Sequence, residues 1–291
     1  MTTRNLTGLS QIADRYDAFI LDLWGVIHDG VTPYPHAAAT LRALRAAGKR
    51  TVLLSNAPRR AFALVDGLTA MGIPRDLYDH VMSSGEAVHG ELASRRDPWY
   101  ARLGRRCLHV GPDRDRNIFE GLDLEIVDRP GEADFVLNTG PDRFDETVDD
   151  YHAVLKACAD RRLPMVCANP DLVVIREGRR VICAGALAER YEALGGEVSY
   201  RGKPDPAIYA LCLELLGVAD RQRVAGVGDA LHPDVAGASA AGIDSIFVTS
   251  GIHGEELGVT EYGQIADPKR VAEVAAAHNQ RPTAAIAAFI W

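Results

Sequence analysis

Short apolar runs alternate along this chain with longer amphipathic segments, and this order leaves few folds open. An apolar run at 18–22 precedes an amphipathic segment at 36–49, and a second run at 50–56 precedes a helical pattern at 59–71. Short apolar runs are typical of buried strands, and helices between them supply the crossovers that parallel strands need. The repeated order therefore predicts a parallel sheet covered by helices.

A second series of strand and helix patterns occupies the middle of the chain, including a hairpin that turns at Glu177 and Gly178. The first rhythm then resumes and runs to about residue 251. We therefore expect an α/β protein with a Rossmann-like, three-layer parallel-sheet core. The core would comprise 1–84 and 190–291, and an inserted α/β cap domain would comprise 85–189.

Composition excludes several classes of function. The 291 residues are 47% hydrophobic with a formal charge of -8, which predicts a sizeable core and argues against nucleic-acid binding. Five cysteines without CxxC spacing suggest buried thiols in a reducing, cytoplasmic protein. No apolar export signal is visible at the start, and the final AAIAAFIW is too short to span a bilayer. We expect that tail to pack against the protein or to contact a second subunit.

Four polar segments each follow a predicted core strand. They are Asp22, Ser55-Asn56, Lys203 and the segment from Asp229 to Asp234. In an open parallel sheet the carboxyl ends of the strands form the ligand-binding edge. Three carboxylates, one lysine and one hydroxyl at that edge suit a divalent cation and a phosphate group.

Each segment alone has an ordinary explanation. Asp22 could cap the turn after its strand, and Ser55-Asn56 before Pro58 could start a helix. Asp205 with Pro206 suits a helix N-terminus, although this does not explain Lys203. The stronger signal is the placement of all four segments at strand ends.

With these motifs in place, FILDLWGVIHDG, GKPDPAIY and GDALHPDVAGA, the chain resembles the haloacid dehalogenase superfamily. The likeness is to its class IIA branch, which carries a large inserted C2-type cap. The resemblance implies that Asp22 is a nucleophile, Ser55 a phosphate-binding residue and Lys203 the motif lysine. It also implies that Asp229 and Asp234 form the acidic pair of the last motif.

The resemblance further implies a magnesium-dependent phosphatase that forms an aspartyl-phosphate on Asp22. The Mg²⁺ set would be Asp22, the backbone carbonyl of Trp24, Asp229 and Asp234, with Asp234 also orienting Lys203. Ser55 and the Asn56 N–H would bind the phosphoryl oxygens, and Asn169 and Asp171 would contact the substrate from the cap. The substrate would be a small phosphorylated metabolite, such as a sugar phosphate or nucleotide, and a homodimer through the cap is a reasonable expectation.

Trp24 departs from the pattern of the phosphatases, which usually have an aspartate two residues after the nucleophile. An indole N–H cannot serve as an acid and a base, and loss of such a group typically costs about 10² to 10⁴ in rate. His28 or, as the second choice, Asp29 could replace this acid/base; both lie in the segment that the family folds as a small flap over the active site. Alternatively, His28 packs within this flap and Asp29 forms an ordinary turn with Gly30. Trp24 itself could be a hydrophobic plug against the cap or could stack on the leaving group.

Two other functions stay open. One is a catalytically weakened or inactive phosphometabolite-binding or regulatory protein, which Trp24 makes plausible and the retained Asp22 opposes. The other is carbon–halogen cleavage at the same nucleophile, which has little use for Mg²⁺ and is therefore opposed by Asp229.

Overall fold

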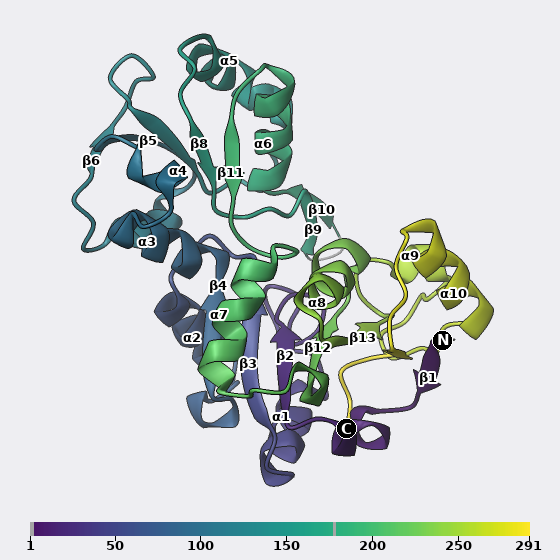
Figure 1. Ribbon diagram of the computed structural model, residues 1–291. Coiled ribbons are helices and arrows are strands. Elements are labelled where there is room, and N and C mark those ends of the chain that lie inside the picture. The colour runs from purple at the N-terminus through teal and green to yellow at the C-terminus, as the bar shows by residue number, and fades with distance from the viewer. Residues whose placement is uncertain (1–2, 177–178) are drawn as a thin grey trace.

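The computed structural model describes residues 3–176 and 179–291. Its fold has the expected α/β class, with a parallel-sheet core and a second sheet with helices above it (Figure 1). The expected hairpin is present as β9 (Val173–Arg176) paired antiparallel with β10 (Arg179–Ile182). Its turn, expected at Glu177 and Gly178, lies outside the described residues.

The core sheet has seven strands, all parallel. The strands in spatial order are β1 (Arg4–Leu6), β14 (Ala284–Ile286), β13 (Asp244–Val248), β12 (Val224–Gly228), β2 (Ala18–Asp22), β3 (Arg50–Ser55) and β4 (His80–Ser83).

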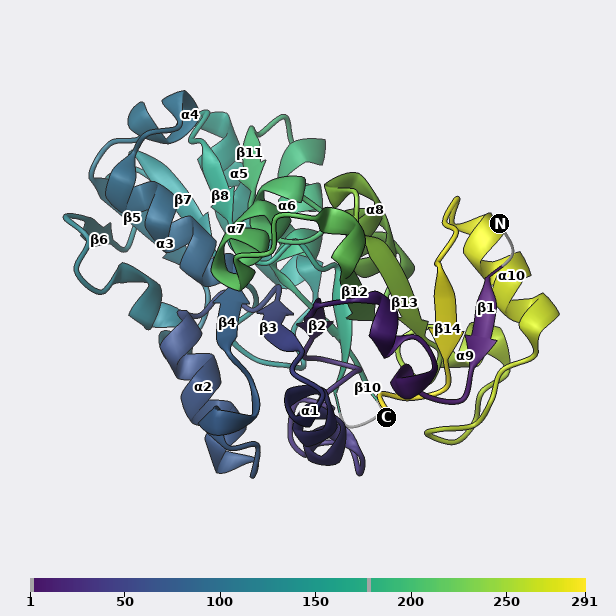
Figure 2. The same ribbon diagram turned by 60° about the horizontal axis from the view of Figure 1, so that its bottom comes forward.

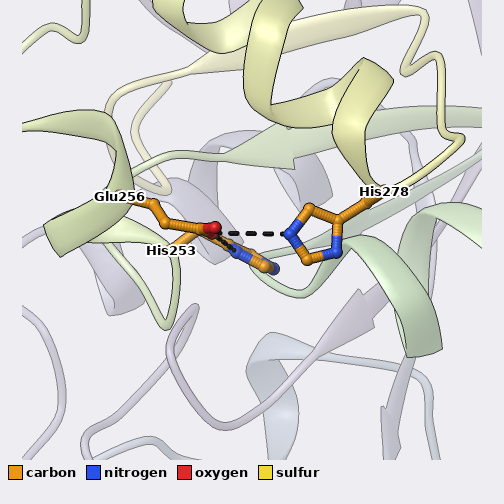
Figure 3. A group of neighbouring side chains, drawn as sticks. All are labelled: His253, Glu256 and His278. Atoms are coloured by element: carbon orange, nitrogen blue, oxygen red, sulfur yellow. Dashed lines mark hydrogen bonds and ion pairs between the residues drawn. The ribbon is translucent and has the colours of Figure 1, made fainter.

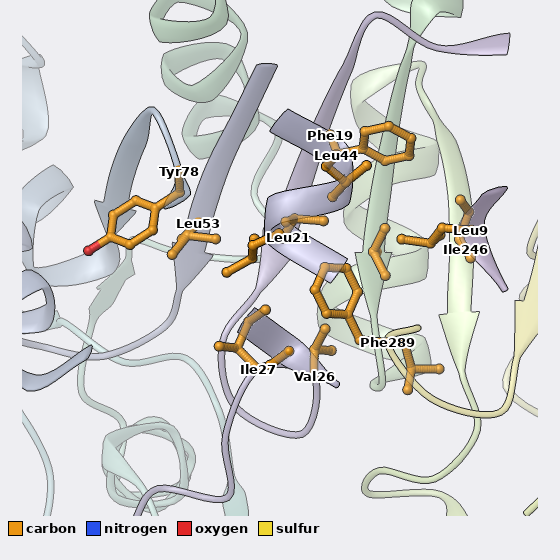
Figure 4. Close-up of a cluster of buried hydrophobic side chains, with 14 of the residues drawn as sticks. Leu9, Phe19, Leu21, Val26, Ile27, Leu44, Leu53, Tyr78, Ile246 and Phe289 are labelled. Atoms are coloured by element: carbon orange, nitrogen blue, oxygen red, sulfur yellow. The ribbon is translucent and has the colours of Figure 1, made fainter. Parts of the chain in front are cut away.

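Strand β2 shows why the core has three layers. Its side chains alternate, so Phe19 and Leu21 enter one apolar cluster while Ala18 and Ile20 enter another on the opposite face. Figure 4 shows the first cluster, in which Phe19 and Leu21 lie near Leu44 of a covering helix. The first face is covered by α1 (Ala37–Ala46) and α2 (Ala61–Ala70), and the second by α7 (Pro206–Leu216) and α8 (Gly237–Ala241).

The C-terminal part extends the core sheet at the edge far from β4 (Figure 2). Helices α9 (Gly254–Leu257) and α10 (Pro268–Ala277) pack against β13 and β14 in a separate apolar cluster. The tail beyond them packs as expected, because β14 joins the sheet and Phe289 is fully buried in the main core.

The cap has its own parallel sheet. Helices α5 (His152–Asp160) and α6 (Ala184–Ala193) cover one face, and α3 (Ser84–Ser94) and α4 (Pro98–Ala101) cover the other. The strands in spatial order are β11 (Val198–Tyr200), β8 (Met165–Cys167), β7 (Phe135–Asn138), β5 (Arg106–Val110) and β6 (Glu125–Val127).

We propose a later domain boundary than the expected one at 189/190. That position falls inside α6, and β11 pairs with β8 of the cap sheet. We therefore propose that the cap extends from about residue 84 to Tyr200. A strand of three residues gives too short an apolar signal to be assigned to either sheet from sequence.

Within the described residues, no helix combines the length and the apolar character needed to cross a membrane.

Candidate active site

Three buried carboxylates meet at the carboxyl edge of the core sheet. Asp22 ends β2, Asp229 follows the adjacent strand β12, and Asp234 lies in the π-helical turn Leu231–Ala236. One carboxylate oxygen from each of the three lies within 4.8 Å of the others. The parallel pairing of β2 with β12 explains why residues two hundred positions apart come together.

Lys203 joins this cluster from the segment between the cap and α7. Its Nζ donates to Asp22 Oδ1 at 2.6 Å and to Asp234 Oδ1 at 2.6 Å. The lysine is 4% exposed, so both ion pairs are shielded from water. The structure thus brings together the lysine and the three acids that the sequence suggested.

The charges of this cluster do not balance. Burial raises the pKa of Asp22 well above its ordinary value, although Lys203 opposes the shift. Burial, followed by the charge of Asp234, raises the pKa of Asp229 to about 7. Burial alone would lower the pKa of Lys203, but Asp22 and Asp234 raise it well above its ordinary value. Three carboxylates against one ammonium group leave an excess of negative charge that a bound cation would neutralise.

The donor atoms of the cluster fit Mg²⁺, which takes oxygen ligands. Asp22 and Asp229 each use one oxygen, toward Lys203 Nζ and Ile252 N respectively, and their second oxygens have no hydrogen-bond partner among the described residues. Asp234 uses both oxygens, toward Lys203 Nζ and Ala230 N. Asp22 and Asp229 are therefore the better direct ligands, and Asp234 is better placed to orient the lysine.

The turn after β2 lies directly against Asp229. Gly25 has φ +83°, and a Cβ built there would lie 2.1 Å from Asp229 Oδ2. Only glycine fits such a close approach without strain. This contact places the backbone of the Trp24–Gly25 turn beside the proposed metal ligands, where the carbonyl of Trp24 was expected.

The Asn56 side chain holds the lysine loop. Asn56 Oδ1 accepts from Lys203 N at 2.7 Å, and Asn56 Nδ2 donates to Lys203 O at 3.1 Å. Asn56 Nδ2 also donates to Asp171 Oδ1 of the cap at 2.8 Å. Sequence reasoning assigned this residue only a backbone N–H toward phosphate, and it missed the positioning role of the amide. Ser55 is buried beside it, and Ser55 Oγ accepts from Ala57 N at 3.2 Å.

The cap-side residues Asn169 and Asp171 lie where they can face a substrate. Asn169 Oδ1 accepts from Asp171 N at 3.0 Å, which fixes the segment after β8. Both residues line the cavity that Asp22, Lys203 and Asp229 also line. The structure places them at the site, and their contact with substrate stays a prediction.

Trp24 reaches across to the cap. Its indole N–H donates to Ile175 O of the β9–β10 hairpin at 2.8 Å. The ring also packs edge-to-face on His28, with the centroids 5.6 Å apart. This contact agrees with the interpretation of Trp24 as a plug against the cap, and it commits the only polar atom of the indole.

The geometry argues against a proton-transfer role for His28 or Asp29. His28 Nδ1 accepts from Gly30 N at 2.9 Å, and burial lowers the pKa of His28 to about 4. A neutral imidazole whose lone pair is already engaged is a poor acid and a poor base. Asp29 Oδ1 accepts from Val31 N and Thr32 N, so Asp29 forms the ordinary turn that was its alternative.

A cavity of about 1340 Å³ separates the core from the cap above this cluster. Its core side includes Ser55, Asn56 and α2, and its cap side includes the β9–β10 hairpin. Sequence reasoning missed several residues that line this cavity, one from the core and four from the cap, because only tertiary packing brings them to the site. They are Arg59, Arg114, Asp115, Phe144 and Arg176.

A second group of metal-type side chains lies beside α9 and is better described as a hydrogen-bonded network (Figure 3). His253 Nδ1 lies 2.7 Å from Glu256 Oε2, and His278 Nε2 lies 3.5 Å from the same oxygen. His253 Nε2 accepts from Leu231 N at 3.3 Å, so Nδ1 must carry the proton that it donates to Glu256. Nε2 of His253 thereby holds the turn that carries Asp234, while Nδ1 is held by Glu256 of α9.

The chain matches two family models, described as haloacid dehalogenase-like hydrolase over residues 19–125 and HAD-hydrolase-like over residues 200–277. Among solved structures it is similar to a hydrolase of the haloacid dehalogenase-like family from Brucella suis 1330. That match has 34% identity and a TM-score of 0.83, and it covers 98% of this chain and 100% of the other.

Two curated relatives are more distant. One is a D-glycerol 3-phosphate phosphatase from Mycobacterium tuberculosis, 28% identical over 84% of this chain and 66% of the relative, just under two thirds of its length. The other is a 4-nitrophenylphosphatase from Schizosaccharomyces pombe, 24% identical over 84% of this chain and 88% of the relative. With the Asp22–Lys203–Asp229 cluster at the sheet edge, these matches show that the chain belongs to the haloacid dehalogenase-like hydrolase family.

Proposed function

We propose that this protein is a Mg²⁺-dependent phosphoric monoester hydrolase that acts on a small phosphorylated metabolite through an aspartyl-phosphate on Asp22. The observation that carries the proposal is the contact of Lys203 Nζ with both Asp22 and Asp234, beside Asp229 and at the cavity between core and cap. The phosphatase names of the two curated relatives support the same reaction class.

The residues present divide the reaction into two displacements. An Asp22 oxygen attacks phosphorus while the ester P–O bond breaks, and water then attacks phosphorus and regenerates the carboxylate. Lys203 neutralises negative charge on Asp22 and on the phosphoryl group, and Ser55 Oγ and nearby N–H groups bind phosphoryl oxygens. Mg²⁺ held by Asp22, Asp229 and the Trp24 carbonyl would offset the repulsion between the carboxylate and the phosphate.

Trp24 leaves both displacements without an acid/base. The leaving oxygen needs a proton in the first step, and the water must lose a proton in the second. The Trp24 indole N–H already binds Ile175 O, and His28 is neutral with Nδ1 engaged. We therefore infer slow turnover: with poor leaving groups the first displacement limits the rate, and with good leaving groups, which need no proton, the aspartyl-phosphate persists.

The same observation favours a second candidate function. A protein that binds a phosphometabolite and reports on it, with little or no turnover, would also keep the cation and phosphate groups while lacking an acid/base. Carbon–halogen cleavage has less support, because Asp229 beside Asp22 suits a cation that dehalogenation does not use.

Intact-protein mass spectrometry separates these functions. The wild type is incubated with Mg²⁺ and a panel of phosphometabolites, with 4-nitrophenyl phosphate as a reactive substrate, and then acid-quenched. We expect a metal-dependent phosphoryl adduct in the wild type and in the exposed-site control Asp128→Asn, and none in Asp22→Asn. Phosphate release without an adduct would refute the proposed intermediate, and binding without an adduct or release would support the regulatory alternative.

The homodimer through the cap and the cytoplasmic location stay predictions. Sedimentation of the purified chain tests the dimer, by comparison with a variant in which charged side chains on the cap surface are replaced by neutral ones.

A further inference from the structure

The cap presents an aromatic ring flanked by two arginines to the cavity of the proposed active site. The Cζ atoms of Arg114 and Arg176 lie 4.7 Å and 4.5 Å from the centroid of the Phe144 ring. Phe144 is 43% exposed although it is large and apolar. All three residues line the same cavity as Asp22 and Lys203.

Both guanidinium groups keep donors available. Stacking on a ring fixes the plane of a guanidinium but leaves its N–H edge free for a carboxylate or phosphate. Arg176 Nη1 donates to Gly30 O at 3.3 Å, and Arg114 Nη1 makes a long contact of 3.5 Å with Asp142 O. Each group has five N–H donors. Among the residues that the structure describes, no carboxylate oxygen lies within 4.0 Å of either arginine.

Neighbouring acids do not fill this role. Arg143 is adjacent to Phe144 in sequence, and its guanidinium lies 3.2 Å from both Asp145 and Glu146. Asp145 and Glu146 thus serve Arg143, whereas Asp142 and Asp115 lie near Arg114 without forming an ion pair with it. Arg114 and Arg176 are two like charges beside one apolar ring, and an anion bound between them would reduce their repulsion.

The cap strand that carries Arg176 contacts the segment after Asp22, away from the phosphoryl site. Ile175, which precedes Arg176, accepts the Trp24 indole N–H, and Arg176 itself contacts Gly30 of the flap. The cavity between them, about 1340 Å³, exceeds the roughly 300–1,000 Å³ of ordinary ligand pockets. Its walls include the apolar side chains of Leu172 and Val174. A phosphoryl group alone would fill only one end.

We propose that Arg114, Phe144 and Arg176 form a subsite for a second anionic group of the substrate. The substrate class is then a phosphomonoester with an apolar or planar body and a carboxylate or a second phosphate at its far end. This inference rests on the proposed phosphatase function, since it assigns the leaving-group side of that site.

Matched probes test the subsite. The probes are ω-carboxyalkyl phosphates and alkanediol bisphosphates of increasing chain length, each paired with the alkyl phosphate of the same length. We expect kcat/KM for the best anionic probe to exceed that of its alkyl partner by about tenfold or more, since hydrogen bonds to charged groups are worth that much. The two anionic series show whether a carboxylate or a phosphate is preferred.

Charge-neutral variants assign the effect to the arginines. In Arg114→Gln and Arg176→Gln the ratio of kcat/KM for the anionic probe to kcat/KM for its alkyl partner should fall several-fold, mainly through a higher KM for the anionic probe. Arg143→Gln, in the loop that carries Phe144, is the matched control and should keep the full preference for the anionic probe. An advantage that persists in the double variant, or that is absent in the wild type while alkyl phosphates are hydrolysed, would overturn the subsite and leave the phosphatase proposal standing.

A binding measurement keeps the two proposals separable. Asp22→Asn removes the nucleophile, so calorimetry on that variant reports affinity without turnover. Tighter binding of the anionic probes than of the alkyl phosphates, lost in the added Arg114→Gln, Arg176→Gln background, supports the subsite even if no probe is hydrolysed. Equal binding of both probe classes refutes it.

Discussion

Replacing Trp24 by aspartate should give the site the acid/base that it lacks. A positioned acid/base contributes about 10² to 10⁴ in rate. The replacement removes the indole N–H bond to Ile175 O, worth about 0.5–1.5 kcal/mol, and the packing of a partly buried ring. Together these losses should cost about 3 kcal/mol of stability, within the 5–15 kcal/mol of a typical domain. The variant should therefore fold and turn over faster than the wild type.

Trp24→Asn is the matched control, because it has the same size and the same lost contacts but cannot carry a proton. Steady-state hydrolysis of an alkyl phosphate, with Mg²⁺ present, compares the two variants, and thermal unfolding checks that their stabilities agree. We expect Trp24→Asp to exceed Trp24→Asn by about a hundredfold or more. Equal rates in the two folded variants would refute the argument that the indole occupies the acid/base position.

Three other outcomes follow from the structure. Gly30→Ala should destabilise the protein more than Gly48→Ala, by about 1–3 kcal/mol in urea unfolding. Both glycines have positive φ, but only the Cβ added at Gly30 would meet Trp24, at 2.2 Å. Equal losses of stability in the two variants would contradict the tight packing. Saturating Mg²⁺ should raise the free energy of unfolding by about 2.7 kcal/mol at a hundred times its Kd, and a melting-temperature shift that survives Asp229→Asn would place the ion elsewhere. Burial lowers the pKa of His109 to about 4, so the unfolded chain takes up the proton first and stability falls as pH drops from about 6.5 toward 4. His109→Asn should remove about 1–2 kcal/mol of that fall between pH 7 and pH 5. An unchanged dependence of stability on pH in this variant would contradict the role of His109.

Sequence patterns were sufficient where strand ends determine the chemistry. Asp22 and Asp229 end or follow adjacent parallel strands, so their meeting follows from the strand order alone. Lys203 could be assigned to the site from sequence, because neither the neighbouring prolines nor the helix N-cap at Asp205 explained a lysine at that position. The continuous apolar run at 18–22 likewise predicted a buried strand.

Contacts between the core and the cap could not be predicted in this way. The bond from Trp24 to Ile175 depends on how the cap docks on the core, and the meeting of Arg114 with Arg176 depends on packing within the cap, so no local spacing encodes either contact. The same holds for the Ile252 N–H that binds Asp229, because a backbone donor leaves no trace in residue type. β11 was assigned to the core for a related reason, since three residues carry too little pattern.

The return of the chain from cap to core has a mechanical consequence. β11 ends at Tyr200, so only Arg201 and Gly202 separate it from Lys203. A movement of the cap would be transmitted through this short connection to Lys203. The two hydrogen bonds of the Asn56 amide to Lys203 N and O oppose that displacement. Asn56 thus fixes the backbone of Lys203 at the junction of cap and core, which keeps the ammonium group in place.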